Sequence, residues 1–73
     1  MSADALTLKI NGQARVLELA DPDLSSLLQA LQIPTIRGVA VALNEQVIPR
    51  SQWAVTPVCE GDQIEIIQAT QGG

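Results

Sequence analysis

The chain has 73 residues, 47% of them hydrophobic, and a formal net charge of −4, so it can form one small domain with an aliphatic core but no deep catalytic cleft. It has no histidine and one cysteine, Cys59, which excludes a disulfide framework, the usual nitrogen and sulfur zinc sites, and a thiol activated by histidine. The basic residues Lys9, Arg15, Arg37 and Arg50 are scattered, so clustered contacts with nucleic-acid phosphates are not expected.

The first predicted elements are two strands joined by a tight turn. Leu6, Leu8 and Ile10 alternate with polar residues, which indicates a strand with one buried face. Asn11-Gly12 favours a two-residue hairpin turn, so residues 13–19 are predicted to return antiparallel to the first strand. The predicted register pairs Ile10 with Gln13, Leu8 with Arg15, and Leu6 with Leu17.

A short amphipathic helix is predicted next. Asp21-Pro22 has the composition of a helix start, with Asp21 accepting a hydrogen bond from a free N–H and proline in the first turn. Ile33-Pro34 is predicted to end the helix, because the residue before a proline resists helical angles. One apolar stripe at helical spacing is expected to cover a sheet face, and it comprises Leu24, Leu27, Leu28 and Leu31.

Three further strands and a helical turn are predicted after the helix. The apolar run 38–43 indicates a strand inside the sheet, and residues 47–49 a short edge strand, because Pro49 cannot donate to a ladder. Ser51 is predicted to cap one turn of helix that carries Trp53. Residues 63–69 are predicted to form the final strand, with Ile64 and Ile66 on its buried face.

This element order predicts an α+β fold, a mixed sheet of four to five strands with one main helix packed across one face. We expect a domain over residues 1–69 and a flexible tail over 70–73. The other sheet face must meet water or a partner. A shallow apolar patch is predicted there, made of Ala40, Ala42, Ile67 and Ala69. It is either an interaction surface or a set of singly exposed side chains.

The last four residues, Thr70-Gln71-Gly72-Gly73, carry no apolar anchor. Two residues without a Cβ can enter a channel too narrow for other side chains. The carboxylate of Gly73, ionised at neutral pH with a reference pKa of about 3.3 to 3.7, can attack the α-phosphate of ATP held by another protein. This attack would form an acyl-adenylate, from which a sulfur nucleophile would displace AMP. The alternative is a frayed end that happens to be glycine.

The chain resembles the ThiS sulfur carriers of thiamine biosynthesis, which share the ubiquitin-like β-grasp fold with the molybdopterin synthase small subunit. Glu45 departs from the resemblance, because relatives often carry glycine at this position. The similarity covers nearly the whole chain and rests on Val41-Ala42-Leu43-Asn44, Val47-Ile48-Pro49-Arg50, Trp53, Gly61-Asp62 and Gly72-Gly73.

The resemblance implies that an E1-like, ThiF-type enzyme uses ATP and Mg²⁺ to adenylate Gly73. Sulfur from a donor protein then replaces one carboxylate oxygen, and the thiocarboxylate serves a ThiG-type thiazole synthase. The chain would be a co-substrate and not an enzyme, with no bound cofactor or metal of its own. Gly72 and Gln71 would lead the carboxylate into the partner, and Arg50 is either a partner contact or a solvated charge.

Two alternatives remain open from the sequence. One is a carrier of the molybdopterin synthase type, against which the absence of phenylalanine argues mildly. The other is a ubiquitin-like binding module that has no use for its last two residues. Because the sequence has neither a basic segment followed by an apolar run at its start nor a long apolar segment, we expect a bacterial cytoplasmic or plastid location.

Overall fold

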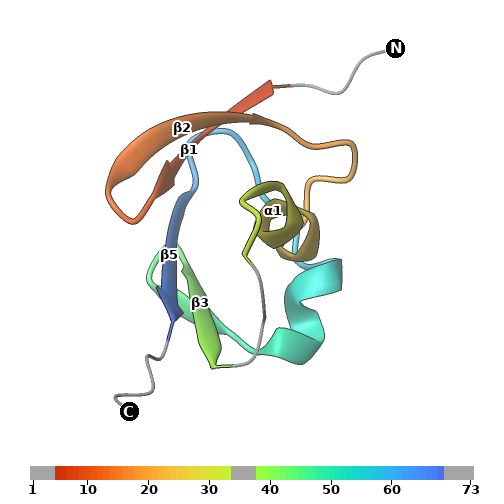
Figure 1. Cartoon of the computed structure of the whole chain (residues 1–73), viewed down its shortest axis with the longest axis vertical. Coiled ribbons are helices and arrows are strands. Elements are labelled where there is room, and N and C mark those ends of the chain that lie inside the picture. The colour runs from red at the N-terminus through yellow and green to blue at the C-terminus, as the bar shows by residue number, and fades with distance from the viewer. Residues whose placement is uncertain (1–4, 34–37, 69–73) are drawn as a thin grey trace.

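The computed structural model describes residues 5–33 and 38–68 and has the predicted α+β architecture. A mixed five-stranded sheet has the strand order β2-β1-β5-β3-β4. The α-helix and a 3₁₀-helix lie on the same side of the sheet (Figure 1). The elements are β1 (Ala5–Ile10), β2 (Gln13–Glu18), α1 (Leu24–Ala30), β3 (Val39–Leu43), β4 (Gln46–Ile48), η1 (Arg50–Val55) and β5 (Gln63–Gln68).

The predicted hairpin register is confirmed. Leu8 lies opposite Arg15 and Ile10 opposite Gln13, and Leu6 pairs with Leu17. Asn11 and Gly12 have φ angles of 50° and 84°, which the turn requires and which these residue types tolerate. On its other side β1 pairs in parallel with β5, but only Lys9 and Ile10 take part in this pairing.

The core between the helical layer and the sheet is aliphatic, with one tryptophan. The predicted stripe of α1 is confirmed, since Leu24, Leu27 and Leu28 are buried and Leu31 packs against them. Trp53 in η1 is also buried, and its Nε1–H donates to the carbonyl of Ile48 at 2.8 Å. The strands contribute Leu8, Ile10, Val41, Ile64 and Ile66, and Leu19 and Val58 complete the core.

The start of α1 differs from the prediction. Asp23 is the N-cap, and its Oδ1 accepts a hydrogen bond from the N–H of Ser26 at 2.8 Å. Asp21 is exposed and does not cap the helix. The helix begins late because the preceding backbone is paired elsewhere: the carbonyl of Pro22 accepts from the N–H of Val58 at 2.9 Å.

The helix also ends before the predicted Ile33-Pro34 boundary. Gln32 adopts a left-handed φ of 59°, and its N–H donates to the carbonyl of Gln29. The N–H of Ile33 reaches the carbonyl of Leu28 at 3.2 Å, which completes a Schellman motif. The termination therefore lies in residues 32 and 33, and Pro34 lies outside the described residues.

The predicted strands after α1 and the helical turn that carries Trp53 are confirmed with small changes in their bounds, but the predicted cap of that turn is wrong. β3 lies inside the sheet and β4 at its edge, with Pro49 directly after it. Ser51 lies within η1 and does not cap it, because Pro49 already occupies the N-cap position, without a side-chain hydrogen bond. β5 ends at Gln68. No helix in the described part of the chain is long and apolar enough to cross a bilayer.

Candidate functional site

The candidate site is the C-terminal half of β5 together with the sheet surface beside it. The central strand β5 is held by β1 on one side and by β3 on the other. Gln68, its last residue, is five residues from the end of the sequence. The position of β5 in the sheet therefore sets the point from which the terminal residues depart.

The open face of the sheet, away from α1, has an apolar patch. Ala40 lies opposite Ile67 in the β3–β5 ladder, and Ala42 lies opposite Val47 in the β3–β4 ladder. Ile67 is 61% exposed and Val47 is 71% exposed. We call Ala40, Ala42, Val47 and Ile67 the sheet-face patch.

The structure brings three of the predicted site residues together, namely Ala40, Ala42 and Ile67, and it adds Val47. The sequence interpretation missed Val47, although the alternation of Gln46, Val47 and Ile48 in an edge strand places it on the face opposite Ile48. Ala69, Gln71, Gly72 and Gly73 lie outside the described residues.

Arg50 is not part of this group. It is the first residue of η1, on the helical side of the sheet, where it borders a shallow groove with Leu28 and Trp53. The sheet-face patch lies on the other side of the sheet. A partner that covered the patch would therefore not contact Arg50 through the same surface.

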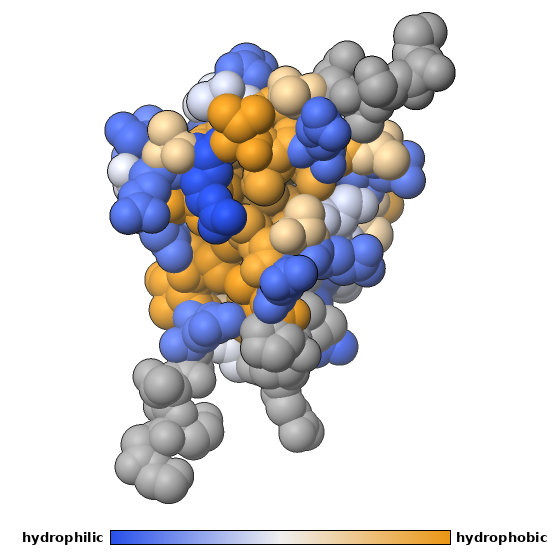
Figure 2. All heavy atoms as spheres, turned by 45° about the horizontal axis from the view of Figure 1, so that its top comes forward, coloured by the Kyte–Doolittle hydropathy of each residue, from blue (hydrophilic) through white to orange (hydrophobic). Residues whose placement is uncertain are grey.

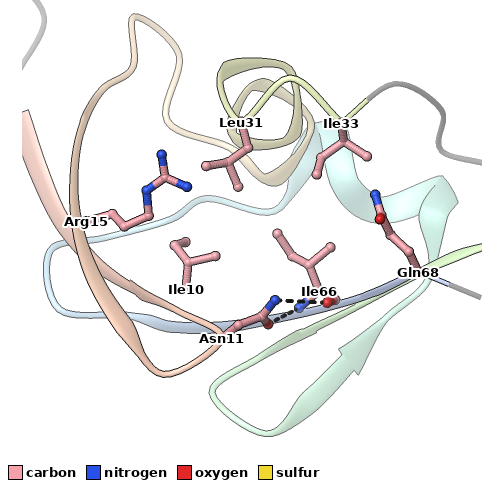
Figure 3. Close-up of a pocket in the computed structure, with 7 residues that line it drawn as sticks. All are labelled: Ile10, Asn11, Arg15, Leu31, Ile33, Ile66 and Gln68. Carbon is pink, nitrogen blue, oxygen red and sulfur yellow. Dashed lines mark hydrogen bonds between the residues drawn. The ribbon is translucent and has the colours of Figure 1, made fainter.

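Asn11 holds the end of β5 through its side chain. Its Oδ1 accepts from the N–H of Ile66 at 2.8 Å, and its Nδ2 donates to the carbonyl of Ile66 at 3.2 Å (Figure 3). Its backbone N–H donates to the carbonyl of Ile64 at 2.9 Å. The side-chain amide thus takes the place that backbone groups of a longer β1 would have in the ladder with Ile66.

Asn44 has the same role at the start of β5. Its Oδ1 accepts from the N–H of Gln63 at 2.9 Å, and its backbone N–H donates to the carbonyl of Gln63 at 2.7 Å. Asn11 and Asn44 both have a φ of 50°, at the first position of a two-residue turn. The sequence interpretation assigned Asn11 to a turn, and Asn44 to a turn and to the family resemblance, but gave neither side chain a role; the available signal was an asparagine whose amide can form two hydrogen bonds.

A hollow of about 390 Å³ lies between the end of α1 and the end of β5 (Figure 3). The side chains of Ile10 and Ile66 lie on one side of it and those of Leu31 and Ile33 on the other, while Arg15 flanks it from β2. On the side of the molecule shown in Figure 2, apolar side chains form a continuous area between polar ones. The helical layer therefore leaves part of the core face of the sheet accessible.

The described residues offer little for catalysis or metal binding. Among them, no group of three or more His, Cys, Asp or Glu side chains is placed to hold a metal ion. Cys59 is exposed in a turn, where its N–H donates to Asp62 and no histidine can activate it.

Comparison with known proteins gives one consistent result. The family model described as the ThiS family matches residues 8–73. The sulfur carrier protein ThiS of Escherichia coli (strain K12) is 50% identical over 36 residues, a stretch that covers 49% of this chain and 54% of that relative. The match therefore spans about half the length of the curated relative.

Solved structures support the same family and the β-grasp fold. A crystal structure of the thiamine biosynthesis protein ThiS from Geobacter metallireducens superposes with a TM-score of 0.79 at 30% identity, covering 93% of this chain and 100% of that chain. A solution structure of a thiamine biosynthesis protein from the same organism gives a TM-score of 0.78 at 30% identity, with 93% and 88% coverage.

Proposed function

The chain belongs to the ThiS family, and on that premise we propose that it is a sulfur carrier for thiamine biosynthesis whose reactive group is the carboxylate of Gly73. The observation that carries the proposal is the extent of the family match, which runs to residue 73 and so includes the terminal Gly72-Gly73 pair. Among the alternatives from the sequence, this match favours the thiamine carrier over the molybdopterin type and the binding module. In this proposal the chain is a co-substrate, not an enzyme.

The proposed chemistry has two steps. A carboxylate oxygen of Gly73 attacks the α-phosphorus of ATP; a P–O bond forms, the bond to the β-phosphate breaks, and pyrophosphate leaves. Sulfide then attacks the acyl carbon, AMP leaves, and the terminal carboxylate has become a thiocarboxylate. The activating partner supplies ATP and Mg²⁺, so this chain needs no cofactor of its own.

The terminal glycines suit this chemistry physically. A carboxylate oxygen of Gly73 must reach the α-phosphate inside the partner's nucleotide site, and a path that excludes water protects the adenylate from hydrolysis. A narrow path admits glycine because it has no Cβ and adopts backbone angles that other residues avoid. Gly72 and Gly73 would occupy this path, with Gln71 at its entrance.

The sheet-face patch is the proposed docking surface for the partners, a ThiF-type activating enzyme and a ThiG-type thiazole synthase. Its four members are apolar, Ile67 lies on the strand that leads to the tail, and Glu65, opposite Ala42, borders the patch. Ala69, two residues beyond Ile67, would extend the patch if the strand alternation continues. Arg50 belongs to the opposite side, so we assign it to the solvated surface.

Intact-protein mass spectrometry tests the proposal. The chain is incubated with a ThiF-type enzyme, Mg²⁺-ATP and sulfide, beside a variant that lacks Gly73. We expect a mass gain that matches the exchange of one oxygen for sulfur in the full chain and none in the deletion variant. The same gain in the deletion variant, or no gain with several active enzymes of this type, would refute the proposed function.

A further inference from the structure

We propose that Asn11 is a positioning residue for the terminal carboxylate, because its side chain fixes the end of β5 from which the tail departs. The inference rests on the proposed sulfur-carrier function and adds a residue to it. Asn11 lies in the first hairpin turn, 55 residues before Ile66 in the sequence. It would act through the backbone of β5, without touching the reacting atoms.

The need for such a residue follows from the unequal lengths of the neighbouring strands. β3 pairs with β5 along its whole length, up to the pairing of Val39 with Gln68. β1 pairs with β5 only through Lys9 and Ile10, opposite Gln63 and Ile64. On the β1 side, residues 65 to 68 therefore have no strand partner.

Asn11 supplies the missing partner at Ile66. Two hydrogen bonds, of 2.8 and 3.2 Å, satisfy both the N–H and the carbonyl of Ile66. The side chain of Ile66 is buried in the core, and its two bonds to Asn11 are half-buried beside the hollow, so an unpaired N–H or carbonyl there would be only partly compensated by water. The amide of Asn11 thus extends the ladder by one residue toward the tail.

The position of Ile66 limits where the carboxylate can be presented. Gly73 is seven residues further on, a distance of about 25 Å at most in an extended chain. If the strand end frays, the departure point moves and fewer molecules have a tail aligned with the partner's channel. The apparent affinity then falls in proportion to the fraction that remains aligned.

Asn44 provides a matched control within the same chain. It also has a φ of 50° and holds the backbone of β5 through its Oδ1, but at Gln63, the end of β5 that is distant from the tail. Replacing either asparagine with glycine keeps the left-handed turn and removes the side-chain bonds. Both variants lose an anchor on β5, and only Asn11→Gly loses it next to the departure point.

The experiment compares the wild-type chain, Asn11→Gly and Asn44→Gly as substrates of a ThiF-type enzyme, with each variant kept below its unfolding transition. For Asn11→Gly we expect KM for the carrier to rise roughly three- to tenfold, with kcat within about twofold. Asn44→Gly should keep the wild-type KM. Amide hydrogen exchange should be faster at Ile66 in Asn11→Gly and unchanged there in Asn44→Gly.

The possible outcomes separate the two claims. Equal KM values for the two variants, or wild-type exchange at Ile66 in Asn11→Gly, would overturn the role of Asn11 while the carrier function stands. A wild-type chain that is never adenylated would overturn the carrier function instead, and with it the catalytic consequence of Asn11. If Asn11→Gly does not fold, Asn11→Asp replaces it. Aspartate keeps the acceptor for the N–H of Ile66 and loses the donor to its carbonyl. An unchanged KM in Asn11→Asp would also overturn the inference.

Discussion

The backbone N–H of Leu24, the first residue of α1, donates to the carbonyl of Thr56 at 3.1 Å. This bond and the bridge between Asp23 and Pro57 attach the start of the helix to the segment that follows η1. The backbone up to Asp23 is thus committed to tertiary pairing and cannot be helical. The N-cap therefore falls to Asp23, although Asp21-Pro22 resembles a helix start in sequence.

The cap can be tested with two neighbouring aspartates. We expect Asp23→Ala to lower the free energy of unfolding by about 0.5 to 2 kcal/mol, because the N–H of Ser26 loses its acceptor. Asp21→Ala should change it by less than about 0.5 kcal/mol, since Asp21 is exposed and does not cap the helix. Urea unfolding measures both, and a larger loss in Asp21→Ala would contradict the assignment.

Local patterns were sufficient to predict much of the fold. The hairpin register followed from Asn11-Gly12, because a two-residue turn fixes which residues are opposite one another. The buried faces of α1 and β5 followed from apolar spacing, since Leu24 and Leu27 repeat with the helix and Ile64 and Ile66 with the strand.

The features that were missed depend on contacts between distant parts of the chain. The cap moved to Asp23 because of residues 56–58, and Asn11 acquired its role from Ile66. No periodicity carries such information. For the candidate site, the sequence predicted Ala40, Ala42 and Ile67 on one face but not Val47, which joins them only because β4 pairs with β3.

The core position Leu27 gives a second prediction. Leu27 is fully buried between α1 and the sheet, so Leu27→Ala should lower the free energy of unfolding by about 2 to 5 kcal/mol. Val55→Ala is the control, because Val55 is 72% exposed and its truncation should cost less than about 0.5 kcal/mol. Fluorescence of Trp53, the single tryptophan, reports unfolding by urea.

The sheet-face patch gives a third prediction, which concerns partner binding. Ile67→Lys places a charge in the patch and should raise KM for a ThiF-type enzyme by about tenfold, or about 1.4 kcal/mol. Val55→Lys makes the same kind of change on η1 and should leave KM unchanged. Similar KM values for the two variants would exclude the patch as the docking surface.

The two tight turns give a fourth prediction, in which one glycine is added and another removed. Glu45 has a φ of 72° and Gly12 a φ of 84°, each at the second position of a turn that begins with asparagine. A residue with a Cβ is strained by about 1 to 2 kcal/mol in this conformation. Glycine avoids this strain, but it loses more backbone entropy on folding, which costs about 0.5 to 1 kcal/mol. Glu45→Gly should therefore raise the free energy of unfolding by up to about 1 kcal/mol.

Gly12→Ala should lower the free energy of unfolding by a similar amount, because it adds a Cβ at a left-handed position. A Cβ at Gly12 would meet no atom within 4 Å, so the cost comes from the backbone angle alone and not from a clash. Because the two changes lie in separate hairpins, their effects should add in the double variant. Thermal or urea unfolding of the four proteins measures this, and a stabilising Gly12→Ala would show that the left-handed angle does not limit the stability of the turn.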